Sequence, residues 1–161
     1  MLKIARQYPD KEELCAPETM QKPTWMERNY TIMEKIEVKS GIFIDGPEGV
    51  TLSASRCKSC GRVYFPKSKY CLDCLGNELE NISLKKRGKL FSYTVGRMPS
   101  THFKPPYAVG FVEMPEGIRI FAPLGIIADK PFKIGMEMEV HAEALWTEGE
   151  KEYIGYQFSP V

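Results

Sequence analysis

The chain has 161 residues, and its 22 Lys and Arg against 21 Asp and Glu give a formal net charge of +1. Hydrophobic residues make up 43% and charged residues 27%, which excludes a disordered tail or a fibrous repeat. No apolar run approaches the ~20 residues of a membrane helix, and the first residues lack the apolar core of an export signal. We therefore expect a cytoplasmic protein of one ordinary domain or two small ones, without a membrane segment.

The first part of the chain, residues 1–49, reads as an N-terminal extension. Three prolines within its first 25 residues exclude a long helix there. Between Trp25 and Val38 a helical spacing competes with a strand alternation, and the sequence leaves both open. Cys15 has no histidine close by in sequence, so we expect an incidental thiol. Apolar runs on both sides of the turn-rich segment 45–49 predict a β-hairpin over residues 42–52.

The charge and the cysteines are concentrated in a short middle segment. Residues 55–79 carry five basic and two acidic side chains and hold four of the five cysteines. Residues 1–54 carry seven basic and nine acidic side chains, and residues 80–161 carry ten of each. An odd cysteine count in a chain without an expected export signal favours metal ligation over disulfides. The near-neutral remainder disfavours a strongly basic nucleic-acid binder.

The four clustered cysteines follow the pattern C-x2-C-x10-C-x2-C. A two-residue gap lets both thiolates of a pair face one ion, and two pairs give the closed tetrahedral set of a structural zinc. We expect Cys57, Cys60, Cys71 and Cys74 to bind Zn²⁺ in a zinc ribbon over residues 50–79, with no metal catalysis because no ligand position is open. Gly61 permits a tight turn, and residues 63–66 are expected to pack around the metal or onto the next domain. A redox thiol pair and a mononuclear iron site are the alternatives.

Basic side chains lie around the cysteines and just after them. They are either solvated surface or an anion-binding patch, because lysine and arginine near a zinc ribbon can meet phosphates. Both interpretations stay open for the first group, Arg56, Lys58, Arg62, Lys67 and Lys69, and for the second, Lys85, Lys86, Arg87 and Lys89.

After the cysteines the sequence changes to short β-runs that are separated by turn residues. Their β-branched and aromatic content predicts five strands, and residues 115–117 predict a tight turn between the second and the third. Five short strands in about 75 residues indicate a small barrel, and we expect a five-stranded OB-fold over residues 80–161. The expected strands are 90–95, 107–114, 118–122, 140–146 and 153–158.

The two histidines receive different predictions. His102 lies in the turn-rich segment 98–106 and is either a plain loop residue or a ligand contact, since loops carry function. His141 lies within an alternating strand, where we expect a structural role. No Ser-His-Asp order, phosphate-binding loop or dinucleotide fingerprint occurs, so the chain does not read as a self-sufficient catalyst.

The order of these motifs resembles a known family. A ribbon with Arg56-Cys-Lys-Ser-Cys-Gly61, Phe65-Pro66 and Cys71-Leu-Asp-Cys74 leads directly into a barrel with Gly88–Val95, Pro106–Glu113, Glu116–Arg119 and Ile134–Met136. Over residues 50–161 this is similar to the family named domain of unknown function 35 (DUF35), which joins a rubredoxin-like zinc ribbon to a C-terminal OB-fold. The fold class implied is mainly β, after an N-terminal extension that is longer than is usual in the family.

The resemblance implies an accessory role without catalytic residues of its own. Family members bind thiolase-like subunits, form hetero-oligomers and help to shape or close the acyl-CoA site, with benzoylsuccinyl-CoA in anaerobic toluene degradation as one substrate to consider. Whether the chain counts as an enzyme then depends on its acyltransferase partner. The residues expected to contact CoA or the partner are Lys58, Arg62, Lys67, Lys69, His102, Phe103, Lys104 and Tyr107.

Two other functions remain open at this stage. Single-stranded nucleic-acid binding would use Tyr107, Phe111 and Phe121 as stacking platforms, but the barrel's zero net charge argues against it. An electron carrier would need iron in place of zinc at the four cysteines.

Overall fold

The computed structural model describes residues 33–46 and 49–161. The chain divides after Thr31, and the description below concerns the second unit. Cys15 and the greater part of the 25–38 segment lie outside the described residues. Every regular element in the described ranges is a strand, so none of these residues belongs to a helix long and apolar enough to cross a bilayer. The mainly β fold class is confirmed.

Five strands close into a barrel, and all five were expected from the sequence. Neighbours pair in the order β6-β7-β8-β10-β9, and β9 pairs back to β6. All pairs are antiparallel except β8 with β10, which run parallel through Phe158 and Leu124. This is the five-stranded OB-fold that the alternating runs predict. The strands are β6 (Arg87–Gly96), β7 (Tyr107–Glu113), β8 (Arg119–Leu124), β9 (Glu137–Glu148) and β10 (Lys151–Pro160).

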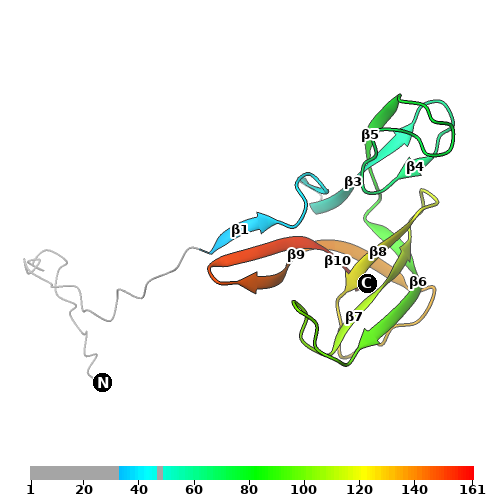
Figure 1. Cartoon of the computed structure of the whole chain (residues 1–161). Coiled ribbons are helices and arrows are strands. Elements are labelled where there is room, and N and C mark those ends of the chain that lie inside the picture. The colour runs from blue at the N-terminus through cyan, green and yellow to red at the C-terminus, as the bar shows by residue number, and fades with distance from the viewer. Residues whose placement is uncertain (1–32, 47–48) are drawn as a thin grey trace, which may run out of the picture. The chain divides into compact units, whose positions relative to one another are not determined.

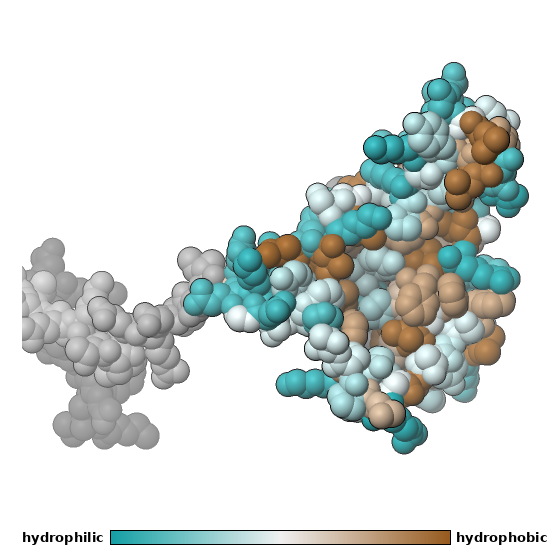
Figure 2. All heavy atoms as spheres, in the orientation of Figure 1, coloured by the Kyte–Doolittle hydropathy of each residue, from teal (hydrophilic) through white to brown (hydrophobic). Residues whose placement is uncertain are grey.

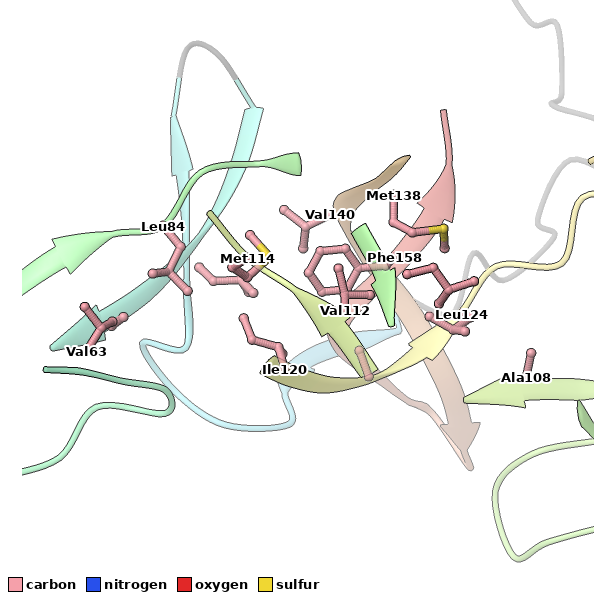
Figure 3. Packing of buried hydrophobic residues seen from close by; sticks show 14 residues of the cluster. Val63, Leu84, Ala108, Val112, Met114, Ile120, Leu124, Met138, Val140 and Phe158 are labelled. Atoms are coloured by element: carbon pink, nitrogen blue, oxygen red, sulfur yellow. The ribbon is translucent and has the colours of Figure 1, made fainter. Parts of the chain in front are cut away.

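Alternate residues of β7 and β8 fill the barrel interior. On β8, Ile120, Ala122 and Leu124 are buried while Arg119 and Phe121 face outward. This period of two is the one expected of a half-buried strand. Figure 3 shows the ring of Phe158 among the side chains of the neighbouring strands, and this residue has no exposed surface.

The connections fix the register of the barrel. The predicted turn at 115–117 is confirmed, because the Met114 amide donates to the Ile118 carbonyl over 2.8 Å. β9 and β10 form a long hairpin, beside which β1 (Glu34–Glu37) runs parallel to the start of β10 (Figure 1). The sequence left a helix and a strand open for this segment, and the structure shows a strand at residues 34–37.

The segment before the barrel forms a second small sheet. The predicted hairpin is confirmed by the pairing of β2 (Phe43–Gly46) with β3 (Gly49–Cys57). β3 also pairs with β4 (Val63–Tyr64) and β5 (Leu79–Ser83), and it delivers Cys57 to the metal site. β5 was not predicted, since its sequence Leu-Glu-Asn-Ile-Ser shows little alternation.

The zinc ribbon and the barrel share one hydrophobic cluster. Leu52, Val63 and Leu84 are buried in the same cluster as the barrel residues, as Figure 3 shows for Val63 and Leu84. The Phe65 ring meets the Tyr156 ring edge-on, with centroids 5.4 Å apart. Packing of the 63–66 segment onto the next domain is therefore confirmed. The boundary expected after residue 79 stays a prediction.

Candidate metal centre and barrel loop

The four predicted cysteines converge at the end of the ribbon. Their sulfur atoms all lie within 4.8 Å of one another. Cys57 Sγ is 3.6 Å from Cys74 Sγ, and Cys60 Sγ is 3.4 Å from Cys71 Sγ. Tetrahedral Zn–S bonds of ~2.3 Å place sulfurs roughly 3.8 Å apart, so this sulfur set fits a zinc ion. All four donors are thiols, which makes the site a closed, structural one.

The backbone of each cysteine pair turns so that both sulfurs face inward. The Gly61 amide donates to the Cys57 carbonyl over 2.9 Å, and Gly61 has a φ of +74° that glycine adopts without steric cost. In the second pair the Cys74 amide donates to Cys71 Sγ over 3.4 Å. A backbone hydrogen bond from Cys60 lowers the pKa of the Cys57 thiol, which favours the metal-binding thiolate.

Tyr64 is one of the residues 63–66 that the sequence predicts to pack around the metal or onto the next domain, and the structure places it at the centre. The hydrogen bonds of its hydroxyl were not predicted. Its hydroxyl lies 3.1 Å from Cys71 Sγ and 2.5 Å from Asp73 Oδ2, and it accepts the Leu72 amide over 3.0 Å. A side-chain hydrogen bond between Cys71 and Tyr64, together with backbone hydrogen bonds from Cys74 and Asp73, lowers the pKa of Cys71 to about 6. Burial, and then its hydrogen bonds to Asp73 and Cys71, raise the pKa of Tyr64 itself. Its position beside the ribbon cysteines was the available signal, but spacing alone does not show which way the hydroxyl points.

The basic residues of the ribbon lie on its surface. Lys58, Lys67 and Lys69 are exposed, and none of them takes part in an ion pair with another described residue. Arg62 is exposed too, but its Nε lies 3.1 Å from Asp73 Oδ2. Arg62 therefore compensates the carboxylate beside Tyr64. Of the ribbon cations predicted to contact CoA or a partner, the three lysines remain without an ion-pair partner among the described residues.

The barrel loop between β6 and β7 is held by aromatic contacts. His102 stacks on Trp146 with centroids 4.6 Å apart, and Trp146 stacks on Tyr153 at 5.0 Å. Phe103 lies 5.6 Å from the Tyr107 ring. The structure thus brings the predicted loop residues together and adds two from the β9–β10 hairpin. Trp146 and Tyr153 were not predicted to contact the loop, because both lie forty or more positions beyond it along the chain.

A polar cavity of about 620 Å³ lies between this loop and β9, lined by residues 99–104 and 145–147. Lys104 lines it and is exposed. No hydrogen bond, ion pair or ring contact among the described residues joins the loop to the ribbon lysines. His141 lies in β9 as predicted, but its side chain is exposed on the strand, so the structural role expected for it is not supported.

The outer face of β6, β7 and β8 carries the aromatic residues considered for nucleic-acid stacking. Phe111 and Phe121 lie 5.3 Å apart and are both exposed, whereas Tyr107 contacts the loop instead. The Arg119 guanidinium lies 3.5 Å from the centre of the Phe91 ring and also pairs with Glu113. Its charge is therefore largely compensated within the chain.

A closed four-cysteine zinc ribbon that packs onto a five-stranded OB barrel defines the class of this protein. Residues 51–80 match the family described as "ChsH2, rubredoxin-like zinc ribbon domain", and residues 82–143 match "ChsH2, C-terminal OB-fold domain". A DUF35 domain-containing scaffold protein of Methanocaldococcus jannaschii is 32% identical over 137 residues, which cover 82% of this chain and 96% of the relative. The chain belongs to the DUF35 family.

Two further relatives carry more specific descriptions. Benzoylsuccinyl-CoA thiolase subunit BbsA of Thauera aromatica is 42% identical over 73 residues, which cover 45% of this chain and about half (51%) of BbsA. Among solved structures, "Ltp2-ChsH2(DUF35) aldolase" matches with a TM-score of 0.57 and 28% identity, over 68% of this chain and 84% of that chain.

Proposed function

We propose that this chain is a non-catalytic subunit of an acyl-CoA thiolase-type complex, in which it binds a thiolase-fold catalytic subunit. The similarity to BbsA, a thiolase subunit, and to the DUF35 chain of an aldolase carries this proposal. The site chemistry is compatible with this role, because four thiol ligands close the metal site and leave no position open for a substrate. The catalytic nucleophile would then belong to the partner. The reducing conditions of a cytoplasm would keep the four ligands as thiolates.

In this function the zinc ion has a structural role and stabilises the fold of the ribbon. A ribbon of about 30 residues cannot bury enough apolar surface to fold alone, so metal binding supplies its folding free energy. Cys57, Cys60, Cys71 and Cys74 hold the ion. Tyr64 and the backbone amides stabilise the thiolates.

The barrel loop is the part of the chain that we place near the acyl-CoA channel of the partner. His102, Phe103 and Tyr107 are already held by ring contacts, so little conformational freedom is lost on docking. Lys104 beside the polar cavity, with Lys58, Lys67 and Lys69 on the ribbon, offers cations for CoA phosphates or for acidic side chains of the partner.

The test mixes this chain with the purified thiolase-type subunit of its organism. We expect a stable hetero-oligomer in size-exclusion chromatography, and thioester cleavage that needs both chains, with benzoylsuccinyl-CoA as the first substrate. His102→Ala should lower activity, while His141→Ala, a matched exposed histidine on β9, should not. Full activity of the partner alone, together with no binding of this chain, would overturn the proposal.

Single-stranded nucleic-acid binding is the second candidate. The exposed Phe111–Phe121 pair on an OB barrel favours it, since such rings can stack bases. Salt-dependent binding of an oligonucleotide well below millimolar, lost in Phe121→Ala, would establish this function in place of the first.

A further inference from the structure

The second cysteine pair carries an apolar surface that the described chain does not cover. Tyr70, Leu72 and Leu75 are 62%, 75% and 82% exposed. They flank the ligands Cys71 and Cys74, and we call these three side chains the knuckle tip. Figure 2 shows hydrophobic side chains at the surface of the ribbon, in the upper right of the view.

Leu75 also has an unfavourable backbone conformation. Its φ is +59°, and every other positive φ among the described residues belongs to a glycine. In this left-handed region the Cβ of an L-residue crowds its own backbone, so a bulky aliphatic residue is rarely found there. The side chain does not offset this strain by burial, because most of it remains in water.

The first cysteine pair shows that the strain is avoidable. Gly61 follows Cys60 as Leu75 follows Cys74, and it adopts a similar φ of +74°. Both turns therefore need a left-handed residue at this place, which glycine provides at no steric cost. The second pair has a leucine there although its side chain is four-fifths exposed. We therefore expect this leucine to contact another molecule.

We infer that the knuckle tip is the anchor by which this chain docks into an apolar pocket with an acidic rim on its thiolase-type partner. This inference rests on the proposed function and names the docking element. The exposed cations Lys58, Lys67 and Lys69 come from the same ribbon and have no ion-pair partner among the described residues, so they complement acidic side chains. Because four sulfurs fix the turn, little conformational freedom is lost when the tip docks.

The chemistry of the tip favours a protein pocket over other surfaces. Two of its three members are aliphatic and have no ring with which to stack a base, so nucleic acid does not use them. A lipid surface also accepts leucine and lysine, but stable membrane binding needs more apolar area or a second anchor. A protein pocket desolvates two leucines completely, which is typical of the centre of an interface.

The experiment uses the full-length, zinc-loaded chain and the purified thiolase-type subunit, with affinity measured by calorimetry. Leu75→Gly copies the first cysteine pair, and Leu72→Ser removes the second aliphatic group. Each should weaken binding by about tenfold or more, the loss expected when a buried leucine is removed from an interface. Ile134→Ser is the matched control, because Ile134 is 69% exposed on the barrel, and its affinity should stay within about twofold.

Zinc content and thermal stability separate docking from folding. Leu75→Gly should keep its zinc and melt at the same or a higher temperature, since it relieves strain. A loss of zinc, or unchanged affinity in both tip variants, overturns the inference while leaving the proposed function intact. If the wild-type chain binds no thiolase-type subunit, the proposed function fails and the inference fails with it. If the tip variants instead lose binding to phosphatidylserine vesicles or to an oligonucleotide, and keep their affinity for the subunit, the inference is also overturned.

Discussion

The hydroxyl group of Tyr64 should control the zinc affinity of the centre at neutral pH. Tyr64→Phe removes the oxygen that lies 3.1 Å from Cys71 Sγ and keeps the ring. This hydrogen bond is the largest of the effects that lower the pKa of Cys71 from 9.0 to about 6. Without it the pKa of Cys71 rises back toward 9.0, and protons compete more strongly with zinc for this sulfur.

The size of the effect follows from the titration of this one thiol. At pH 7 a thiol of pKa about 6 is mostly thiolate, whereas one of pKa 9.0 is only about 1% thiolate, which limits the loss to roughly 100-fold. Backbone amides keep part of the shift, so we expect a loss of about 10- to 100-fold, as for other outer-shell substitutions. The lowered pKa favours zinc binding between about pH 6 and 9, so the loss should shrink as the pH rises through 9.

A competition titration against a chromophoric zinc chelator, at pH 7 and again near pH 9, measures this difference. Tyr70→Phe is the matched control, because Tyr70 lies in the same segment and its hydroxyl makes no hydrogen bond among the described residues. Equal zinc affinity of Tyr64→Phe and the wild type at pH 7 would refute the reasoning. A loss of the same size at both pH values would show that the hydroxyl acts by packing and not through the thiolate.

Three other changes test the metal centre and the barrel. Cys60→Ser, or a strong chelator, should remove zinc, make the ribbon sensitive to proteolysis and lower the melting temperature, because Leu52 of the ribbon packs in the shared core. Phe158→Ala should lower the free energy of unfolding in a urea titration by about 3–5 kcal/mol, since the ring is fully buried. Gly110→Ala should cost about 1–3 kcal/mol in the same assay because its Cβ would meet the Ser92 carbonyl oxygen. Unchanged stability of Cys60→Ser would contradict the structural role of zinc, and unchanged stability of the other two variants would contradict the packing of the barrel.

The metal centre and the kind of barrel were predictable from local patterns in the chain. The ligand pattern of Cys57 to Cys74 could be read directly, because two cysteines separated by two residues share a turn, and two such turns can surround one ion. The barrel strands were predictable because burial of one face imposes a period of two within each run. Both signals are local, so they can be recognised in the sequence without knowing any distant contact.

The contacts between groups far apart in the chain became known from the three-dimensional fold alone. It pairs β8 with β10 in parallel, stacks Trp146 on His102 and turns the Tyr64 hydroxyl toward Cys71. It also shows that Leu75 has the left-handed conformation that Gly61 has in the first cysteine pair. None of these leaves a repeating pattern in the chain, because a contact between separate strands depends on register and side-chain direction, which neighbouring residues do not encode.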